Sequence, residues 1–170
     1  MSVTLTTARL TLRAPVLADF AAYHAFWSTD RSAGLGGPLD MPGIWAWFCH
    51  DVAQWSLFGH GGLMIERRAD GVVIGQVCLS QGPLFPELEL GWFLYDGFEG
   101  QGYAVEAARA ARDWAFDVLN VPTIVSYVGL DNPASRRLAE RLGAVEDPRA
   151  PTMFGKPDRV YRHPRPEAAL

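Results

Sequence analysis

Three glycines stand within the segment GFEGQGYA, which runs from Gly97 to Ala104 and leads into an alanine-rich stretch. Because glycine has no side chain to screen the backbone, the amides of Gln101 to Val105 can turn toward a single bound anion. These amides also belong to the first turn of an expected helix, where N–H groups lack intrahelical acceptors and carry partial positive charge. Such a site suits a phosphate or pyrophosphate. The alternative is a tight turn with no ligand, because glycine-rich turns are weak motifs.

The spacing of these glycines fits neither of two familiar phosphate motifs. It departs from the dinucleotide fingerprint G-x-G-x-x-G, and Gln101 stands where a phosphate loop has lysine, with no Ser or Thr after it. The four histidines share no metal-ligand spacing, so the sequence predicts no metal site. Cys49 and Cys78 stand in apolar surroundings without a disulfide framework, so we expect both thiols to be reduced, buried and structural.

The composition is that of a globular protein, which we expect to form one domain over residues 1–170, with 49% hydrophobic and 20% charged residues. The formal net charge is −4 and no basic run occurs, so nucleic acid is not an expected partner. No apolar run approaches the roughly 18 residues of a membrane span. The N-terminal segment lacks the apolar core of a signal peptide, so we expect a cytoplasmic protein without membrane attachment.

The pattern of apolar residues predicts the elements that position the glycine loop. Period-two alternation from Arg9 to Ala14 indicates a strand, and helical spacing follows over residues 16–28. Residues 31–43 are rich in glycine and proline and are expected to form a loop. The other expected elements are a helix over 44–58, strands over 61–80 around a turn at 69–71, a strand over 87–95, a helix within 97–116, a strand over 123–129, a helix capped by Asp131 or Asn132 and ended by Gly143, and weaker strands over 144–148 and 158–163.

This order of elements predicts a mixed sheet covered by helices. The strands before and after the segment 97–116 are separated by a helix and can therefore lie parallel. Alanines recur on one face of that helix at near 3.6-residue spacing, which allows a close approach to the sheet.

Two segments at this separation resemble the GNAT superfamily of acetyltransferases. They are LGWFLYDGFEGQGYAVEAARAARDWAF and VGLDNPASRRLAERLGA, and the N-terminal RLTLRAPVLADF is similar to the same Rim-type branch of ribosomal-protein and small-molecule N-acetyltransferases. The resemblance covers residues from about 6 to 161. It implies an α/β fold with a central mixed, mostly antiparallel sheet of about seven strands flanked by about four helices. It also implies acetyl-CoA as the donor and a primary amine as the acceptor, with no metal.

The resemblance further implies where each part of the donor lies. The family splays the strand before the loop away from the strand after the helix, and the pantetheine arm enters this gap while the pyrophosphate sits on the loop amides. In this branch an asparagine contacts the cofactor arm, and the pattern N-x-x-S-x-R puts an arginine near the phosphates. By this similarity the cofactor-binding residues are Phe93 and Leu94 through their backbone, Gln101, Gly102, Tyr103 and Ala104 through their amides, and Asn132 and Arg137.

The same resemblance suggests two catalytic residues. Glu89 stands two residues before Gly91, where the branch often has an acid, and strand alternation puts it on one face with Glu87. A carboxylate there can attract an ammonium group and remove its proton directly or through water. The alternative is that both glutamates are solvated strand residues. Many relatives place a tyrosine seven residues after the asparagine to protonate the departing thiolate, but this chain has Ala139, so Ser135 is the expected acid.

Several residues near the expected site admit two interpretations. Glu99 replaces the Arg or Gln with which many family members begin the loop, and we expect it to point into solvent. His50 and Asp51 either bind an amine or face water. The aromatic residues that either shape the acceptor pocket or belong to the core are Trp45, Trp47, Phe48 and Trp55.

Two functions remain compatible with the sequence. The first is an amine N-acetyltransferase that acts by direct attack in a ternary complex, and the second is a coenzyme A-binding module without turnover. The acceptor is a protein N-terminus, a polyamine, an amino acid or an aminoglycoside. The few acids of this region, Asp40, Asp51 and Glu89, argue mildly against the polycationic aminoglycosides. Either a monomer or a homodimer is compatible with these patterns.

Overall fold

The computed structural model describes residues 3–153 and 156–166, and this part contains one mixed sheet. Its strand order is β1-β2-β3-β4-β5-β6-β8-β7. Neighbouring strands are antiparallel except β5 and β6, which are parallel, as expected for strands joined through a helix. The strands are β1 (Leu5–Thr6), β2 (Leu10–Arg13), β3 (Gly62–Arg67), β4 (Val72–Ser80), β5 (Glu89–Leu94), β6 (Val125–Val128), β7 (Val145–Glu146) and β8 (Arg159–Arg162). The sequence predicted all of them except β1.

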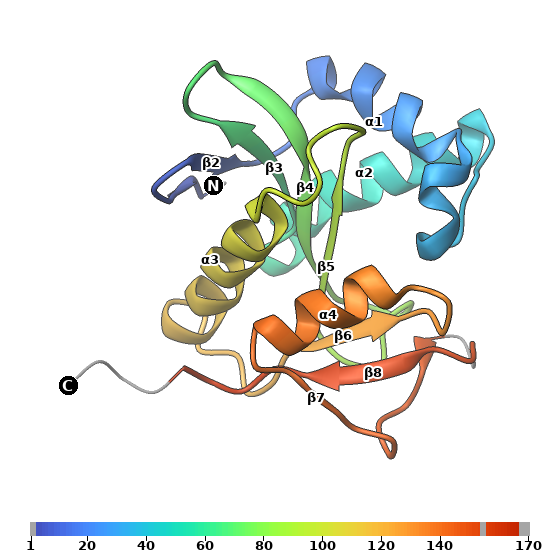
Figure 1. Ribbon diagram of the computed structural model, residues 1–170, viewed down its shortest axis with the longest axis vertical. Helices are drawn as coiled ribbons and strands as arrows, with labels where there is room; N and C mark the ends of the chain where they lie inside the picture. The colour runs from blue at the N-terminus through green and yellow to red at the C-terminus, as the bar shows by residue number, and fades with distance from the viewer. Residues whose placement is uncertain (1–2, 154–155, 167–170) are drawn as a thin grey trace.

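Helices cover both faces of the sheet. Figure 1 shows α3 (Tyr103–Asp117) and α4 (Pro133–Arg141) on one face, and α1 (Phe20–Trp27) and α2 (Met41–Phe58) on the other. Two 3-10 helices, η1 (Leu17–Asp19) and η2 (Asp30–Leu35), flank α1. The predicted fold class is confirmed.

The expectation of a loop over residues 31–43 was wrong at both ends. Residues Asp30–Leu35 form η2, in which Ser32 is completely buried and its hydroxyl shares its one proton between the carbonyls of Trp27 (3.1 Å) and Thr29 (2.8 Å). At the other end α2 begins at Met41, since the Asp40 carboxylate accepts a hydrogen bond from the Gly43 amide at 3.0 Å. Asp40 is therefore the N-cap of α2.

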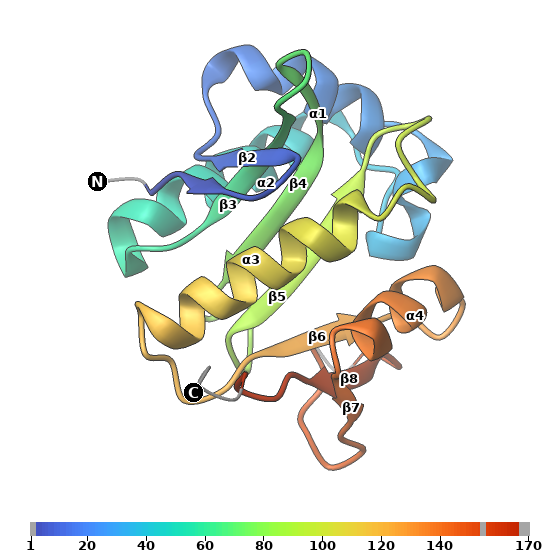
Figure 2. The same cartoon turned by 60° about the vertical axis from the view of Figure 1, so that its left-hand side comes forward.

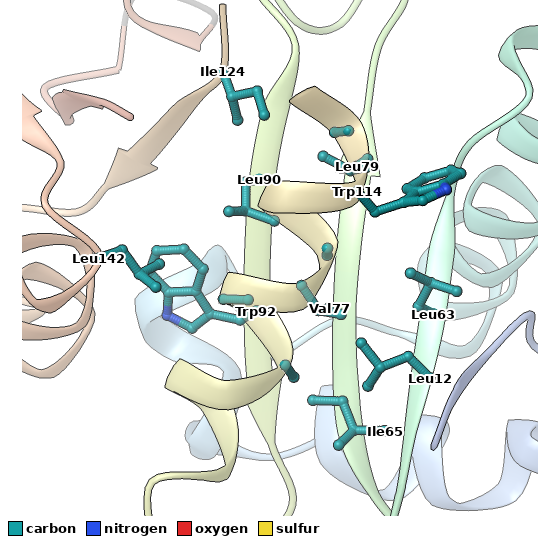
Figure 3. Packing of buried hydrophobic residues seen from close by; sticks show 14 of the residues in the cluster. Leu12, Leu63, Ile65, Val77, Leu79, Leu90, Trp92, Trp114, Ile124 and Leu142 are labelled. Carbon is teal, nitrogen blue, oxygen red and sulfur yellow. The ribbon is translucent and has the colours of Figure 1, made fainter. Parts of the chain in front are cut away.

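The core is divided by the sheet. On the α3 face, leucine, isoleucine and valine side chains of β2 to β5 pack against the alanine face of α3, as Figure 3 shows. On the other face Tyr23, Phe26 and Trp27 of α1 pack against Ile44 and Phe48 of α2. The helix lies close to the sheet, because four of its alanines are completely buried against it: Ala107, Ala108, Ala111 and Ala115. This close packing fixes the position of the first turn of α3 relative to β5.

Strands β5 and β6 separate soon after they meet. Their backbone pairing is confined to Glu89 opposite Val125, whereas β4 and β5 pair over six residues. One step further the Ser126 hydroxyl, not a backbone amide, donates to the Leu90 carbonyl at 2.5 Å. Figure 2 shows the two strands diverging from this point, with α3 and α4 on either side of the opening. The splay that the family resemblance implied is present in the fold.

Candidate functional site

A groove of about 510 Å³ occupies the opening between the diverging strands. Its walls come from η2, from β5, from the loop before α3, from the first turn of α3 and from α4. Seven of the ten residues predicted for the site line it, namely Phe93, Leu94, Gly102, Ala104, Asn132, Ser135 and Arg137. Gln101, Tyr103 and Glu89 do not line it.

The loop that enters α3 has the backbone that its glycines predicted. Gly97, Gly100 and Gly102 have φ angles of 85°, 75° and 81°, in the left-handed region that other residues avoid. Gly102 is the N-cap of α3, and its carbonyl accepts the hydrogen bond of the Glu106 amide at 3.1 Å. The amides of the preceding turn have no acceptor within the helix, and two glycines leave them uncovered. This arrangement of uncovered amides at the loop before α3 fits an anionic group such as a pyrophosphate.

The side chains of Gln101 and Tyr103 point elsewhere. The Gln101 side-chain amide donates to the Gly97 carbonyl at 3.3 Å, and the Tyr103 ring is buried under the Arg9 guanidinium, 4.5 Å from the ring centre. Any contribution of these two residues to the groove comes from their backbone amides, which is the role that the sequence predicted for them.

The opposite wall is the start of α4. Asn132 is its N-cap, with the side-chain oxygen accepting from the Ser135 amide at 3.0 Å. The Asn132 side-chain nitrogen faces η2, and a Cβ at Gly34 would lie 2.7 Å from it. Glycine at position 34 therefore allows η2 to lie directly against the head of α4. Ser135 is partly buried on the groove side, and Arg137 is exposed at the rim.

Glu99 is not simply directed into solvent. Its carboxylate forms an ion pair with Arg31 of η2 and accepts a hydrogen bond from the Gly97 amide at 3.0 Å. Arg31, Gly34 and Leu35 all line the groove. The segment η2 thus spans the groove from the glycine loop to α4, and sequence reasoning missed it because its composition was that of a loop.

Glu89 lies on the sheet face opposite α3, beside the point where β5 and β6 separate. Its side chain is near Gly91, since a Cβ there would be 3.7 Å from the carboxyl group. Burial raises the pKa of Glu89 to about 8, and the nearby carboxyl groups of Asp51 and Asp158 add to the shift. Glu87, on the same face, is held in an ion pair with Arg162 at 2.7 Å. In the described part of the chain, Glu89 therefore has no cation partner, whereas Glu87 does.

Asp51 neither faces water nor reaches the groove. It is buried, and its carboxylate accepts hydrogen bonds from the Tyr23 hydroxyl at 3.0 Å and the Gln76 side chain at 2.9 Å. Burial raises its pKa to about 6. The Cys78 thiol lies 3.5 Å from the same carboxylate, so Cys78 is part of this polar cluster. Cys49 is exposed, which corrects the expectation that both thiols are buried.

The aromatic residues of α2 divide between the two interpretations. Phe48 and Trp55 belong to the core, and the Trp55 indole donates to the Gly62 carbonyl at 2.8 Å. Trp45 is exposed and Trp47 is half-buried beside Phe85. None of these four lines the groove, whereas Phe26 of α1 does, stacked on Phe93 with ring centres 4.5 Å apart. Helical spacing identified Phe26 as apolar but gave no sign that it lines a site.

Comparisons with known proteins agree with this geometry. Residues 9–145 match the acetyltransferase (GNAT) domain family. A solved acetyltransferase from Agrobacterium tumefaciens str. C58 is 55% identical and superposes with a TM-score of 0.93 over 96% of this chain and 95% of that chain. RimL, a ribosomal L7/L12 α-N-protein acetyltransferase solved in complex with coenzyme A, is 17% identical with a TM-score of 0.73 over 95% of this chain and 96% of that chain, which shows a shared fold.

A curated relative, YkkB of Bacillus subtilis (strain 168), is 24% identical over 135 residues, which is 79% of this chain. The chain spans 66% of the length of YkkB and 45% of that of a second curated relative from the same bacterium. In the described part of the chain, no helix is long and apolar enough to cross a membrane. Nor do any three His, Cys, Asp or Glu side chains among those residues lie close enough together to hold a metal ion.

Proposed function

The chain belongs to the GNAT acetyltransferase family, and from this premise we propose that it transfers the acetyl group of acetyl-CoA to a primary amine, either a protein N-terminus or a small molecule. The observation that carries the proposal is the groove between the splayed strands, headed at one end by the uncovered amides of α3 and walled at the other by α4. A groove of this shape suits a long ligand with an anionic end.

The donor fits the residues that are present. The amides of Gln101, Gly102, Tyr103 and Ala104 would hold the pyrophosphate, since they combine free N–H groups with the positive end of a helix. Beyond Glu89, the edge of β5 on the groove side pairs with no strand of the described chain, and at Phe93 and Leu94 this edge would run beside the amide-containing pantetheine arm. Asn132 and Arg137 line the same groove from α4.

The reaction requires a neutral amine, a proton acceptor and a donor for the thiolate. Acetyl-CoA supplies an activated acyl group when bound, and direct attack by the amine forms the amide bond while the sulfur leaves. Glu89 is the proposed proton acceptor, because it lies where the strands part and no cation among the described residues pairs with it. Ser135 is the proposed donor to the sulfur, because it is the hydroxyl group on the groove side of α4.

An amine acceptor agrees with the charge of this region. Burial and, after it, the nearby carboxyl groups of Asp51 and Asp158 raise the pKa of Glu89, so a cation beside Glu89 would be favoured. RimL acts on an α-amine of a protein, which supports a protein N-terminus as one acceptor class. The isolated α-amine has a pKa near 8, so it requires less assistance than a lysine amine with a pKa near 10.

One observation supports the alternative of a coenzyme A-binding module. Ala139, where many relatives have a tyrosine, is completely buried in the core and offers no proton donor. Catalysis would then depend on Ser135 or on water.

The deciding experiment combines calorimetry with a thiol-release assay. We expect heat on titration with coenzyme A, and release of free thiol from acetyl-CoA when the panel of amines contains an acceptor. The panel comprises peptides with varied N-termini, polyamines, amino acids and aminoglycosides. Binding without acceptor-dependent thiol release across this panel would favour the binding module. Absence of coenzyme A binding by the folded protein would contradict both.

A further inference from the structure

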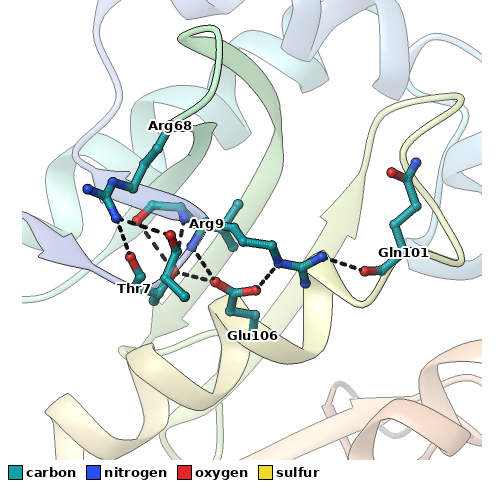
Figure 4. Close-up of polar contacts among 7 residues, drawn as sticks. Thr7, Arg9, Arg68, Gln101 and Glu106 are labelled. Carbon is teal, nitrogen blue, oxygen red and sulfur yellow. Dashed lines mark hydrogen bonds and ion pairs between the residues drawn. The ribbon is translucent and has the colours of Figure 1, made fainter.

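Arg9, immediately before β2, connects this N-terminal segment to the loop before α3. Its Nε donates to the Glu106 carboxylate at 2.6 Å, and its Nη1 donates to the Gln101 carbonyl at 3.0 Å. The guanidinium lies flat over the Tyr103 ring, 4.5 Å from its centre. Figure 4 shows this side chain reaching along α3 from Glu106 to the loop. Sequence reasoning assigned Arg9 only to a strand.

The hydrogen bond to Gln101 determines the direction of a loop amide. In a trans peptide unit the carbonyl of one residue and the N–H of the next point in opposite directions. The Gln101 carbonyl is turned toward Arg9, so the Gly102 N–H is turned away from Arg9. Gly102 lines both the groove and a second hollow of about 460 Å³, whereas Arg9 lines only the second hollow. Arg9 lies on the side of the second hollow, so the Gly102 amide that is turned away from Arg9 is turned toward the groove side.

Glu106 keeps Arg9 in this position. Its other carboxylate oxygen accepts hydrogen bonds from the Thr7 hydroxyl at 2.6 Å and from the Arg9 amide at 2.9 Å. Burial opposes ionisation of Glu106, but the hydrogen bonds from Thr7 and Arg9 outweigh it and lower its pKa. The charge of Arg9 is thus already paired, which argues that the residue acts on an anion through geometry rather than as a free positive charge.

We infer that Arg9 is a positioning residue for the anion-binding loop, holding the Gln101–Gly102 peptide so that its amide faces the pyrophosphate of the acyl donor. The inference rests on the proposed function. A flexible peptide unit would lose conformational entropy when the donor binds. Because Arg9 already fixes its orientation, that cost is reduced and the affinity for the donor is higher. Arg9 touches neither the groove nor the reacting atoms.

The backbone at Arg9 is held independently of its side chain. Its carbonyl accepts from the Arg68 amide at 2.9 Å, and Arg68 also donates from its side chain to the carbonyls of Thr7 (3.0 Å) and Ala8 (3.1 Å). Substitution of the Arg9 side chain therefore leaves β2 paired. Arg68→Gln is a matched control, since it removes the same charge from the same edge without touching the loop.

The test is calorimetric titration of the full chain with coenzyme A and with pantetheine, which lacks the pyrophosphate. Arg9→Gln should weaken coenzyme A binding by about 10- to 100-fold, the usual effect of losing hydrogen bonds from a charged group. Pantetheine binding should be unchanged, and so should both affinities in Arg68→Gln. Equal loss for both ligands would indicate a general structural defect and would overturn the inference.

Two further readouts separate positioning from direct electrostatic attraction. Glu106→Gln frees the charge of Arg9 but loosens its anchor, so positioning predicts weaker coenzyme A binding and attraction predicts tighter binding. In the unliganded protein, the amide resonance of Gly102 should shift in Arg9→Gln and stay in place in Arg68→Gln. A parent protein that binds no coenzyme A would contradict the proposed function. A parent and an Arg9→Gln variant that bind equally well would contradict this inference alone.

Discussion

Replacement of Glu89 by glutamine gives the sharpest test of how the acceptor loses its proton. The pKa of Glu89 is raised to about 8 by burial and by the neighbouring carboxyl groups, so below that pH the side chain is mostly neutral. Glutamine has the same shape and no charge, and the variant should therefore fold at neutral pH. What it loses is the ability to take a proton, a capacity typically associated with a rate factor of about 10²–10⁴.

The pH dependence of that loss follows from two pKa values. With an acceptor amine of pKa about 10, the parent requires ionised Glu89 and a protonated amine, a combination most abundant between about pH 8 and 10. The variant requires an amine that has lost its proton in solution, so its kcat/KM rises tenfold per pH unit up to about 10. Below pH 8 both rates fall together, and above it the parent rate levels off while that of the variant keeps rising. The ratio of parent to variant should therefore be about tenfold smaller at pH 9 than at pH 7.

The assay is kcat/KM from thiol release between pH 6 and 10, with one lysine-like acceptor throughout. Glu87→Gln is the matched control, because it removes an acid from the same strand face that is already paired with Arg162. The ratio of kcat/KM of the parent to that of Glu87→Gln should be near one at every pH. Parallel profiles for the parent and Glu89→Gln would refute the reasoning and leave the proton to water or another group.

Three further predictions concern the donor groove and the core. Gly102→Asp should abolish coenzyme A binding in calorimetry, because it places a carboxylate among the loop amides. The control Gly71→Asp, at a hairpin-turn position with a similar positive φ of 72°, should cost only about 1–2 kcal/mol of stability. A folded Gly102→Asp variant with full affinity would exclude the loop amides as the pyrophosphate site. Ser135→Ala should lower kcat by roughly 10- to 1,000-fold with coenzyme A affinity unchanged, and Ser135→Thr should retain most of the rate. An undiminished kcat in the alanine variant would show that Ser135 is a helix-start residue only. Burial, with Arg112 nearby, lowers the pKa of His163 to about 4, so on acidification the unfolded chain takes up the proton before the folded chain does. About 3 kcal/mol of the stability present above pH 6.5 should therefore be lost as the pH falls toward 4. Urea unfolding should show that His163→Gln lacks this loss, and the same change of unfolding free energy with pH in both proteins would contradict the prediction.

Local patterns predicted the parts of the site that depend on local chemistry. The sequence offered Asp131 or Asn132 as the cap of α4, and the structure has Asn132, because a helix start needs a side-chain acceptor at that position. It also placed Gly102 in a loop that leads into a helix, and Gly102 is the N-cap of α3. The alternation along β5 placed Glu89 and Leu90 on opposite faces for the same reason. These choices depend on a few neighbouring residues, so they can be recognised without knowing what packs above them.

Residues whose roles depend on distant segments could not be predicted. Asp51 was expected either to bind an amine or to face water, but it is buried, and Tyr23 and Gln76 from other elements donate hydrogen bonds to its carboxylate. Glu99 looked unpaired until η2 brought Arg31 to it. In each case the partner stands far away in the chain, and helical or strand periodicity contains no information about it.

The separation of β5 from β6 raises a problem that the fold resolves with side chains. A carbonyl at Leu90 that lost its strand partner would be buried without a donor, at a cost of about 1–3 kcal/mol. The Ser126 hydroxyl fills that place at 2.5 Å, and its only proton is then used. His163, 2.9 Å away, must consequently donate from Nε2, which leaves its buried Nδ1 as a bare lone pair without a partner in the described chain. A proton added at Nδ1 would be a buried N–H without an acceptor, which agrees with the low pKa of His163. The groove thus opens where the Ser126 hydroxyl, with neutral His163 beside it, takes the place of one backbone hydrogen bond between β6 and β5.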